Sequence, residues 1–328
     1  MPTTNITRAI LSCILMLSCW FGAANAQPQS SDYPNRPIRV LVPYGPGGVD
    51  YQIRALAPAL GSILGQQIVV ENREGGGAII GTAAVKNAPP DGYTLLFTGT
   101  AALTVVPHLR KTGYVIGDFE PIGNVTATPL IVTARGNAPF RTLAELLAYA
   151  RADPGKVNMG SSGSGTSTHI VGEALQAAAG IKFTHVPFRG VGAATTAMLS
   201  GDVDLVIGVP GVMVPHFPTG KLIAVASTGK ARSEFAPDVP TLVEAGFDVV
   251  EETKFGLLAP RGTPEPVLRR LTDALAKAAT APEFIELMRK SFATQAYLSP
   301  PQFRAAIDVE DAYWGKLLKD PRFKDLIQ

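Results

Sequence analysis

The feature that most constrains the fold of this chain is a repeated order of buried strand, polar turn and amphipathic helix. Residues 38–42 form a short apolar run, and the glycine-rich turn 43–48 follows them. From 53 to 63, apolar residues recur at helical spacing until Gly65, after which 67–71 has the composition of a strand. This segment therefore predicts a strand, a helix and a second strand.

The same order recurs to the end of the chain. Further strands are predicted at 94–98, 130–133, 205–209 and 222–227, and further helices at 143–152, 169–179, 193–199, 266–278 and 301–319. Thr142 has the position of a helix N-cap, and Pro58 predicts a kink in the first helix. Strands that alternate with helices predict an α/β fold with mainly parallel sheets.

Three loops that follow predicted strands are candidate binding loops, namely 43–50, 98–102 and 160–168. In open α/β sheets, ligands bind beyond the carboxyl ends of the strands. The first and third loops are 110 residues apart, from Asp50 to Gly160, farther than one βαβ unit of roughly 30 residues spans. We therefore predict two lobes that face each other across a cleft.

The loop 160–168 offers many backbone N–H and hydroxyl donors but no carboxylate, lysine, arginine or cysteine. Because it leads into a predicted helix, it suits an anion held by dipoles and hydrogen bonds. The alternative is a flexible, solvated turn whose Ser or Thr residues cap the helix. In the loop 43–50, Asp50 suits a helix N-cap or a loop brace better than a ligand contact, because a carboxylate repels an anionic ligand.

The first 26 residues have the pattern of a cleaved export signal. Arg8 supplies the positive charge, 9–21 is apolar, and 24–26 is a small-residue cleavage site. The apolar stretch is shorter than the roughly 20 residues of a membrane span, which argues against a retained anchor. A lipoprotein signal would use Cys19, and the residues before it fit that alternative poorly. We predict export to a Gram-negative-type periplasm.

Composition then limits the chemistry of the exported chain. Both cysteines, Cys13 and Cys19, lie in the predicted signal, so the exported chain would have no disulfides, thiolate metal sites or thiol catalysis. A net charge of +2 with 17% charged residues leaves no basic excess for binding nucleic acid.

Metal, cofactor and hydrolase motifs have little support. The histidines are His108, His169, His185 and His216, and no two have the i, i+4 spacing of a helical metal site. His169 is predicted to cap the helix or to line the cleft. The glycines 75–77 lack a phosphate-loop motif and predict a structural turn, without a cofactor. A hydrolase that uses a serine of 160–168 would lack an arranged histidine and acid.

A series of sequence blocks, in order, carries a resemblance over the whole exported chain. The blocks are 37–48, 69–73, 90–95, 158–169, 185–190, 201–204, 239–246 and 256–260, with Trp314 near the end. Together they resemble the Bug family of periplasmic solute-binding proteins, also called TctC-like proteins or tripartite tricarboxylate transporter receptors.

The resemblance implies an α/β, two-lobed periplasmic binding protein fold of type II. Each lobe would be a mainly parallel sheet flanked by helices, and the chain would cross between lobes twice. Residues 27–125 and 255–328 would form the first lobe, and 126–254 the second. The resemblance also implies that a small carboxylate is held in the cleft. We expect a monomer without a cofactor.

The same resemblance places ligand contacts on the three loops. They are Tyr44, Gly47, Gly48 and Asp50 in the first loop, Thr98, Gly99 and Thr100 in the second, and Ser161, Ser162, Gly165, Thr166 and Ser167 in the third. We add Val49, His169, Arg189 and Gly208 as candidates, although a surface role for Arg189 stays open.

Three positions depart from the family pattern. Only Val49 separates Gly48 from Asp50, where family members usually have one residue more. Lys254 replaces a common Trp, and Gly208 replaces a common polar or acidic residue. If both positions face the cleft, they favour a more anionic ligand.

The main hypothesis is a non-enzymatic periplasmic receptor that presents a small carboxylate to membrane permease subunits. A receptor that signals ligand occupancy to a membrane kinase is the alternative, and an exported serine hydrolase is a third hypothesis.

Overall fold

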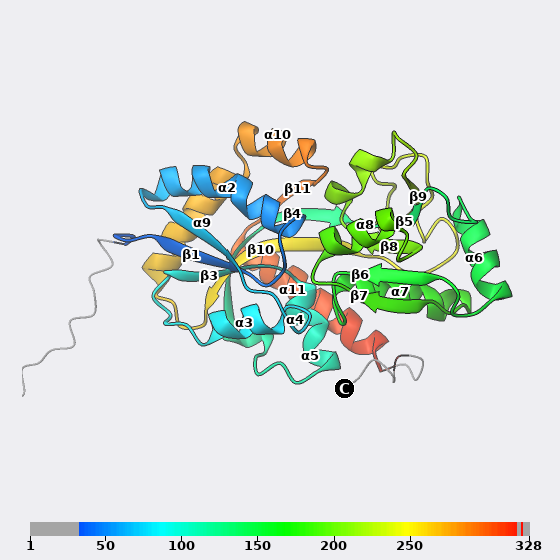
Figure 1. Ribbon diagram of the computed structural model, residues 1–328. Helices are drawn as coiled ribbons and strands as arrows, with labels where there is room; N and C mark the ends of the chain where they lie inside the picture. Colours follow the sequence, from blue (N-terminus) through cyan, green and yellow to red (C-terminus); the bar gives the residue numbers. More distant parts are fainter. Residues whose placement is uncertain (1–32, 320–322, 324–328) are drawn as a thin grey trace, which may run out of the picture. The chain divides into compact units, whose positions relative to one another are not determined.

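The computed structural model describes residues 33–319 and Phe323. The predicted export signal, 1–26, lies outside the described residues. All features discussed below belong to one compact unit, Pro34–Gln328. That unit contains two sheets with helices on both faces of each (Figure 1), which confirms the α/β class.

The larger sheet has six strands in the order β11-β4-β10-β3-β1-β2. Its strands are β1 (Ile38–Val42), β2 (Ile68–Asn72), β3 (Thr94–Gly99), β4 (Phe119–Pro129), β10 (Glu252–Pro260) and β11 (Gln295–Leu298). The helices around it are α2 (Val49–Leu64), α3 (Ile79–Lys86), α4 (Ala101–Thr104), α5 (Val106–Leu109), α9 (Glu265–Ala279), α10 (Pro282–Lys290) and α11 (Pro300–Leu317). Helices α2 and α9 cover one face, and α3 and α11 cover the other (Figure 1).

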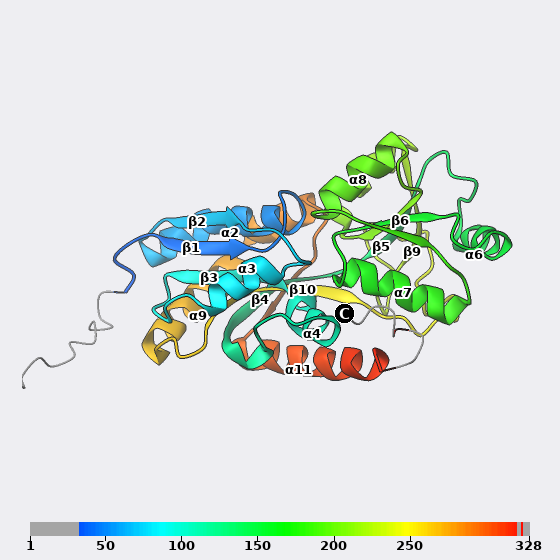
Figure 2. The same cartoon turned by 60° about the horizontal axis from the view of Figure 1, so that its bottom comes forward.

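The smaller sheet has five strands in the order β7-β6-β8-β5-β9. They are β5 (Ile131–Arg135), β6 (Asn158–Ser161), β7 (Thr184–Pro187), β8 (Leu205–Gly208) and β9 (Leu222–Ser227). Its helices are α6 (Leu143–Ala152), α7 (Ser167–Ala179) and α8 (Val191–Ser200). Helices α7 and α8 lie on opposite faces of this sheet (Figure 2).

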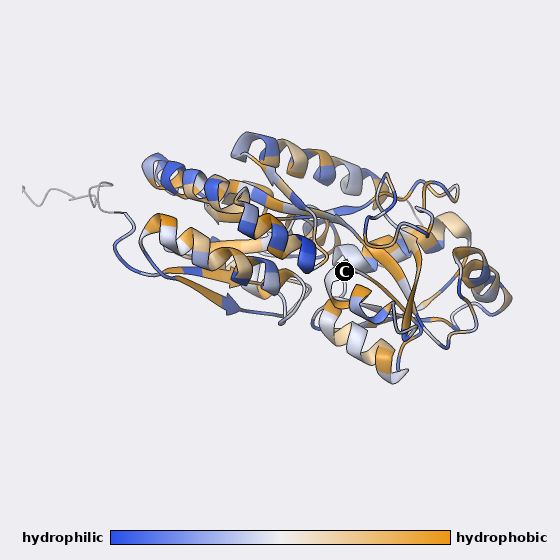
Figure 3. Ribbon diagram, turned by 90° about the horizontal axis from the view of Figure 1, so that it is seen from above, coloured by the Kyte–Doolittle hydropathy of each residue, from blue (hydrophilic) through white to orange (hydrophobic). Residues whose placement is uncertain are grey.

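Each sheet has its own hydrophobic core. Leu41, Leu96 and Phe303 are buried between the larger sheet and α11, and Ile131 and Met198 are buried between the smaller sheet and α8. Figure 3 shows the helices with mixed hydrophilic and hydrophobic surfaces, as expected when one stripe packs on a sheet. Within 33–319 and 323, none of the helices combines the length and the apolar character that crossing a membrane requires.

The prediction of mainly parallel sheets is wrong. Four strand pairs are parallel, β1 with β2 and β3 and β6 with β7 and β8. Five are antiparallel, three made by β10 and β11 with their neighbours and two made by β5. The reason is that β4 leads from the larger sheet to β5 in the smaller one, whereas β10 leads back, so the two crossing strands run in opposite directions.

The predicted lobe boundaries, after 125 and after 254, stay a prediction. Strand pairing within the larger sheet continues past both points, because Thr126–Pro129 pair with residues 252–255 of β10. The chain then enters the smaller sheet at Ile131 and leaves it after Ser227.

Most predicted elements occur within a few residues of their expected bounds. Helix α6 and strand β9 match, the Thr142 hydroxyl accepts a hydrogen bond from the Glu145 N–H as an N-cap, and α2 ends at Gly65. Helix α2 is continuous through Pro58. Strand β4 was not predicted, because its sequence contains proline, glycine and asparagine, which are typical of turns.

Candidate functional site

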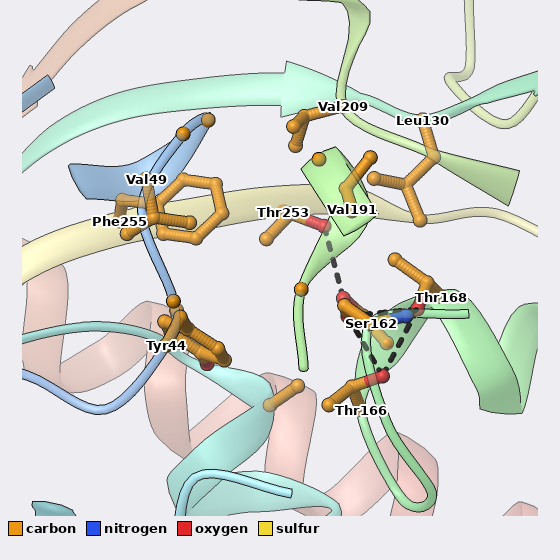
Figure 4. A pocket seen from close by; sticks show the side chains of 18 of the residues that line it. Tyr44, Val49, Leu130, Ser162, Thr166, Thr168, Val191, Val209, Thr253 and Phe255 are labelled. Carbon is orange, nitrogen blue, oxygen red and sulfur yellow. Dashed lines mark hydrogen bonds between the residues drawn. The ribbon is translucent and has the colours of Figure 1, made fainter. Parts of the chain in front are cut away.

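A pocket lies between loops that follow strands of the two sheets (Figure 4). Its lining residues are Tyr44, Gly45, Pro46, Gly47, Gly48, Val49, Gly99, Ala101, Leu130, Ser162, Thr166, Ser167, Thr168, Gly190, Val191, Gly192, Val209, Thr253 and Phe255. No lysine, arginine, aspartate or glutamate is among these described lining residues.

Three helices begin at this pocket. Helix α2 follows Gly48, α7 follows Thr166 and α8 follows Gly190, and all three cap residues line the pocket. None of the three caps makes a side-chain hydrogen bond to its helix in the described structure. The first N–H groups of a helix have no intrahelical acceptor. They also carry the positive end of the helix dipole, so the pocket suits an anion.

Glycine is required where α2 begins. Gly47 has φ +104° and Gly48 has φ +45°, values at which a side chain is strained. A Cβ on Gly48 would also lie 3.2 Å from Val209 Cγ2. The glycine pair therefore lets the backbone N–H groups of this turn line the pocket directly.

Hydroxyl groups cluster at the start of α7. Ser162 Oγ lies 3.0 Å from Thr166 Oγ1 and 2.9 Å from Thr168 Oγ1, and the latter two are 3.0 Å apart. The Thr166 hydroxyl donates to the Gly163 carbonyl at 2.7 Å, and the Ser162 hydroxyl donates to Thr166. The Thr168 hydroxyl also accepts from the Ser162 N–H at 2.9 Å. Its own proton is the one that can turn toward a bound anion.

Tyr44 adds a neutral donor from the other loop. Its hydroxyl lies 3.3 Å from Thr98 Oγ1, and burial raises the pKa of the phenol. The pocket can therefore offer hydroxyl and N–H donors from both sheets without a formal cation.

A chain of polar contacts braces the first loop from behind. The Arg54 Nε donates to both carboxylate oxygens of Asp50 at 2.9 Å, and its Nη2 donates to Asn72 Oδ1 at 2.9 Å. Asn72 Nδ2 in turn donates to the Tyr44 carbonyl at 2.9 Å. Asp50 is thus the predicted brace and not a lining residue, and the N-cap interpretation is wrong because Gly48 holds that position.

The structure brings eight of the sequence-predicted site residues together at the pocket. They are Tyr44, Gly47, Gly48, Val49, Gly99, Ser162, Thr166 and Ser167. The other eight lie behind or beside it, and each has a structural contact. They are Asp50, Thr98, Thr100, Ser161, Gly165, His169, Arg189 and Gly208.

The predicted contacts of the second loop are divided between the pocket and its support. Gly99 lines the pocket, and a Cβ there would lie 2.9 Å from the Phe255 ring, so glycine allows that ring to pack against the loop. Thr98 supports the Tyr44 hydroxyl. Thr100 is buried and donates to the Glu310 carboxylate of α11 at 2.7–2.8 Å.

Ser161 and His169 hold the third loop from its inner side. Ser161 Oγ lies 2.7 Å from His185 Nε2 and accepts from the Gly163 N–H at 3.1 Å. The His169 Nδ1 accepts from the Gly165 N–H at 3.1 Å, and its ring stacks on His185 at 3.8 Å. Burial, together with the neighbouring His169, lowers the pKa of His185 to about 4. Both histidine rings are therefore parts of the loop's support, and neither lines the pocket.

The two cationic candidates point elsewhere. The Arg189 side chain is 85% exposed and reaches Glu74 at 3.5 Å, whereas its carbonyl accepts from the Gly45 N–H at 3.1 Å. Lys254 Nζ donates to the Glu252 carbonyl at 3.2 Å and lies 3.8 Å from Glu310. The pocket lining includes neither side chain.

Gly208 lies beneath the pocket. A Cβ there would lie 2.7 Å from Val191 Cγ1 and 3.5 Å from Met213 Cε. The glycine therefore lets Val191 pack down onto β8, and Val191 itself lines the pocket. Lys254 and Gly208 would favour a more anionic ligand only if they faced the pocket, and neither lines it.

Sequence reasoning missed much of the pocket wall. The missed residues are Gly45, Pro46, Ala101, Leu130, Thr168, Gly190, Val191, Gly192, Val209, Thr253 and Phe255. The glycine before α8 could have been found, because Gly190 lies just before the helix predicted at 193–199. Leu130, Val209 and Phe255 are apolar residues in or beside strands, and nothing in the sequence distinguishes them from core residues.

An acid lies behind the pocket. Glu251 is 5% exposed, and its Oε1 accepts a hydrogen bond from the Thr253 hydroxyl at 3.1 Å. The same Thr253 hydroxyl lies 3.4 Å from Ser167 Oγ. Burial and the nearby Glu310 raise the pKa of Glu251 to about 8.

In the described part of the chain, no group of three or more His, Cys, Asp or Glu side chains has a metal-binding arrangement.

The chain is similar to one family over most of its length. The family described as tripartite tricarboxylate transporter family receptor matches residues 52–321. A UPF0065 protein of Cupriavidus necator is 35% identical over 285 residues, which cover 86% of each chain.

Solved structures agree with the sequence match. The periplasmic binding protein BugD is 33% identical with a TM-score of 0.83, over 88% of this chain and 98% of that one. A protein from R. palustris, solved with adipate, is 28% identical with a TM-score of 0.82, over 88% of this chain and 98% of that one.

Proposed function

This chain belongs to the tripartite tricarboxylate transporter receptor family. We propose that it captures a small carboxylate in the pocket and delivers it to a membrane permease of the tripartite type. Members of the family are periplasmic solute-binding proteins with two lobes. A similar protein was solved with adipate, which is a dicarboxylate. Release to a permease and the absence of catalysis are parts of this proposal.

The observation that carries the proposal is the meeting of three helix N-termini at one pocket without a cation. A carboxylate placed there can accept hydrogen bonds from the first turns of α2, α7 and α8 and from the Thr168 hydroxyl. Hydrogen bonds to an ionised acceptor are about twice as strong as neutral ones. Fixed dipoles thus replace the water that the anion loses on binding.

The position of Ser161 argues against a catalytic role. Among the described residues near the pocket, it is the serine that contacts a histidine. Ser161 Oγ is 2.7 Å from His185 Nε2, but Ser161 is fully buried and does not line the pocket. A nucleophile must reach the substrate. Ser162 does line the pocket, and its hydroxyl contacts only threonines.

Isothermal titration of the chain from Gln27 onward tests the proposal, with short carboxylates compared with their uncharged amides. We expect carboxylates to bind and amides to bind at least tenfold more weakly, because helix N-termini favour the negative charge. Failure of every carboxylate to bind, or equal binding of acids and amides, would contradict the proposal.

A Thr168→Val variant tests the site itself. It keeps the shape of the side chain but removes the hydroxyl, which accepts from the Ser162 N–H and can donate to the ligand. We expect about tenfold weaker carboxylate binding, since a hydrogen bond to a charged group contributes about 1.5–3 kcal/mol. Thr133→Val is the matched control, because Thr133 is equally buried in β5 and its hydroxyl has no partner among the described residues. Equal affinities of the two variants would place the anion elsewhere.

A further inference from the structure

The pocket has two chemically different sides. The hydroxyls of Ser162, Thr166 and Thr168 lie on one side, and apolar side chains lie on the other (Figure 4). The apolar side chains are Val49, Leu130, Val191, Val209 and Phe255. Leu130, Val209 and Phe255 are at most 6% exposed, so this wall is formed by side chains already held in the packed interior.

The apolar side chains themselves offer neither a cation nor a side-chain donor to a second charge. The two cationic candidates do not line the pocket either, because Lys254 lies beside Glu310 and Arg189 lies beside Glu74 in solvent. Two hydroxyl-bearing residues flank the apolar side chains in Figure 4. The Tyr44 hydroxyl lies 3.3 Å from Thr98 Oγ1, and the Thr253 oxygen is already within reach of Glu251 and Ser167. A carboxylate directed against the apolar side chains would lose water without gaining a cationic partner.

The packing under the wall also keeps it apolar. Val191 sits over Gly208, where a larger residue would displace it. Val209 lies against Gly48, at the start of α2. Val191 and Val209 therefore lie next to the helix ends proposed to bind the anion, and they also form part of the apolar wall. An apolar surface thus lies within a few atoms of a bound carboxylate.

We propose that the solute is a monocarboxylate with an uncharged, apolar body, held by its carboxylate at the three helix ends and by its body against the apolar wall. This inference rests on the proposed function and narrows its ligand. Burial of each methylene group strengthens binding about fourfold. An unpaired second carboxylate in the same place is strongly unfavourable, because a charge needs a partner when it leaves water.

Calorimetry with matched acids tests the inference. Butanoate, hexanoate and benzoate are the probes. Succinate and adipate match the first two in carbon number but have a carboxylate in place of the terminal methyl group, and phthalate is benzoate with a second carboxylate. We expect affinity to rise from butanoate to hexanoate, and each monocarboxylate to bind at least tenfold more tightly than its partner. Tighter binding of the dicarboxylates would overturn this inference and leave the proposed function standing. No binding by any of the six acids would count against the proposed function itself.

A Val209→Thr variant tests the wall directly. The substitution is nearly isosteric and places one hydroxyl on the apolar side, so hexanoate binding should weaken about threefold to tenfold while butanoate changes less. Val243→Thr is the control, because Val243 is 43% exposed and does not line the pocket. Thermal melts establish that both variants are folded. Unchanged hexanoate affinity in a folded Val209→Thr protein would show that the body of the solute does not lie against this wall.

Discussion

Glu251 is a buried carboxyl group that forms a hydrogen bond with Thr253, which lines the pocket and also contacts Ser167. Its raised pKa, about 8, means that the folded protein holds a proton at neutral pH that the unfolded chain releases near the ordinary value of 4.5. Lys254 opposes this shift, and Glu310, whose own pKa is raised by burial, reinforces it. A protonated Glu251 can donate to Thr253, which leaves the Thr253 hydroxyl free to donate toward Ser167.

The raised pKa predicts how stability depends on pH. Between about pH 4.5 and 8 the folded state binds more protons than the unfolded state at this site, so this contribution to the free energy of unfolding falls as pH rises through that window. Glu251→Gln cannot be charged at this position. We therefore expect its free energy of unfolding to exceed that of the native protein by at least about 2 kcal/mol at pH 8.5 and to be nearly equal to it at pH 4.5. Urea denaturation at the two pH values measures this difference.

Glu283→Gln is the control for the same experiment, because Glu283 is exposed in the first turn of α10 and is not among the charges that shift the pKa of Glu251. It should keep the native pH dependence. Glu310 will retain part of that dependence in Glu251→Gln, since burial raises its pKa as well. Equal pH slopes in the native protein and Glu251→Gln would mean that Glu251 does not hold the proton.

At the scale of elements, the short first loop depends on its neighbours for its shape. Only Val49 separates Gly48 from Asp50, and α2 begins at Val49 itself. The loop is tied to β2 through Asn72, which accepts from Arg54 of α2 and donates to the Tyr44 carbonyl. A single side chain therefore connects strand, loop and helix.

Asn72→Ala removes both of these hydrogen bonds. We expect a loss of about 1–2 kcal/mol in the free energy of unfolding and at least fivefold weaker carboxylate binding, because the N–H groups of the loop lose their fixed position. Chemical denaturation and calorimetry measure the two effects. Asn87→Ala, at the end of α3 and outside the pocket lining, is the control. Native affinity in a destabilised Asn72→Ala protein would show that the loop is held by other contacts.

At the scale of the whole molecule, loops from the two sheets touch beside the pocket. The Gly45 N–H donates to the Arg189 carbonyl at 3.1 Å. Gly77, with φ +66°, lies against the Ser164 carbonyl oxygen, and an added Cβ would collide with it. The predicted structural turn at 75–77 is thus also a point of close approach between the two halves of the pocket.

Gly77→Ala should keep the two loops apart and weaken carboxylate binding at least tenfold. Gly220→Ala is its matched control, since Gly220 has φ +67° and open space around its Cα, so it carries the backbone strain without the collision. Small-angle scattering with saturating ligand should give a larger radius of gyration for Gly77→Ala than for the control. Equal affinities of the two variants would show that the close approach of Gly77 to Ser164 is not needed for binding.

The sequence predicted those parts of the site that depend on local chemistry. Glycines at 47 and 48, where φ is positive, and a hydroxyl-rich turn before α7 are recognisable from the residues alone. Asp50 could be recognised as a brace because a carboxylate is unsuited to face an anion. The apolar wall could not be predicted, since Leu130, Val209 and Phe255 resemble any buried residue beside a strand.

The sequence by itself determined where most of the strands, loops and helices follow one another, though not the strands β4, β10 and β11, and that the hydroxyl-rich loop 160–168 carries donors without charge. These properties depend on neighbouring residues, through backbone dihedral angles and helix ends. Only the tertiary structure decided that three helix N-termini meet at one pocket, that the crossing strands β4 and β10 pair antiparallel, and that Lys254 and Arg189 face away from the pocket. Such contacts join residues far apart in the chain, and their geometry depends on the packing of both sheets.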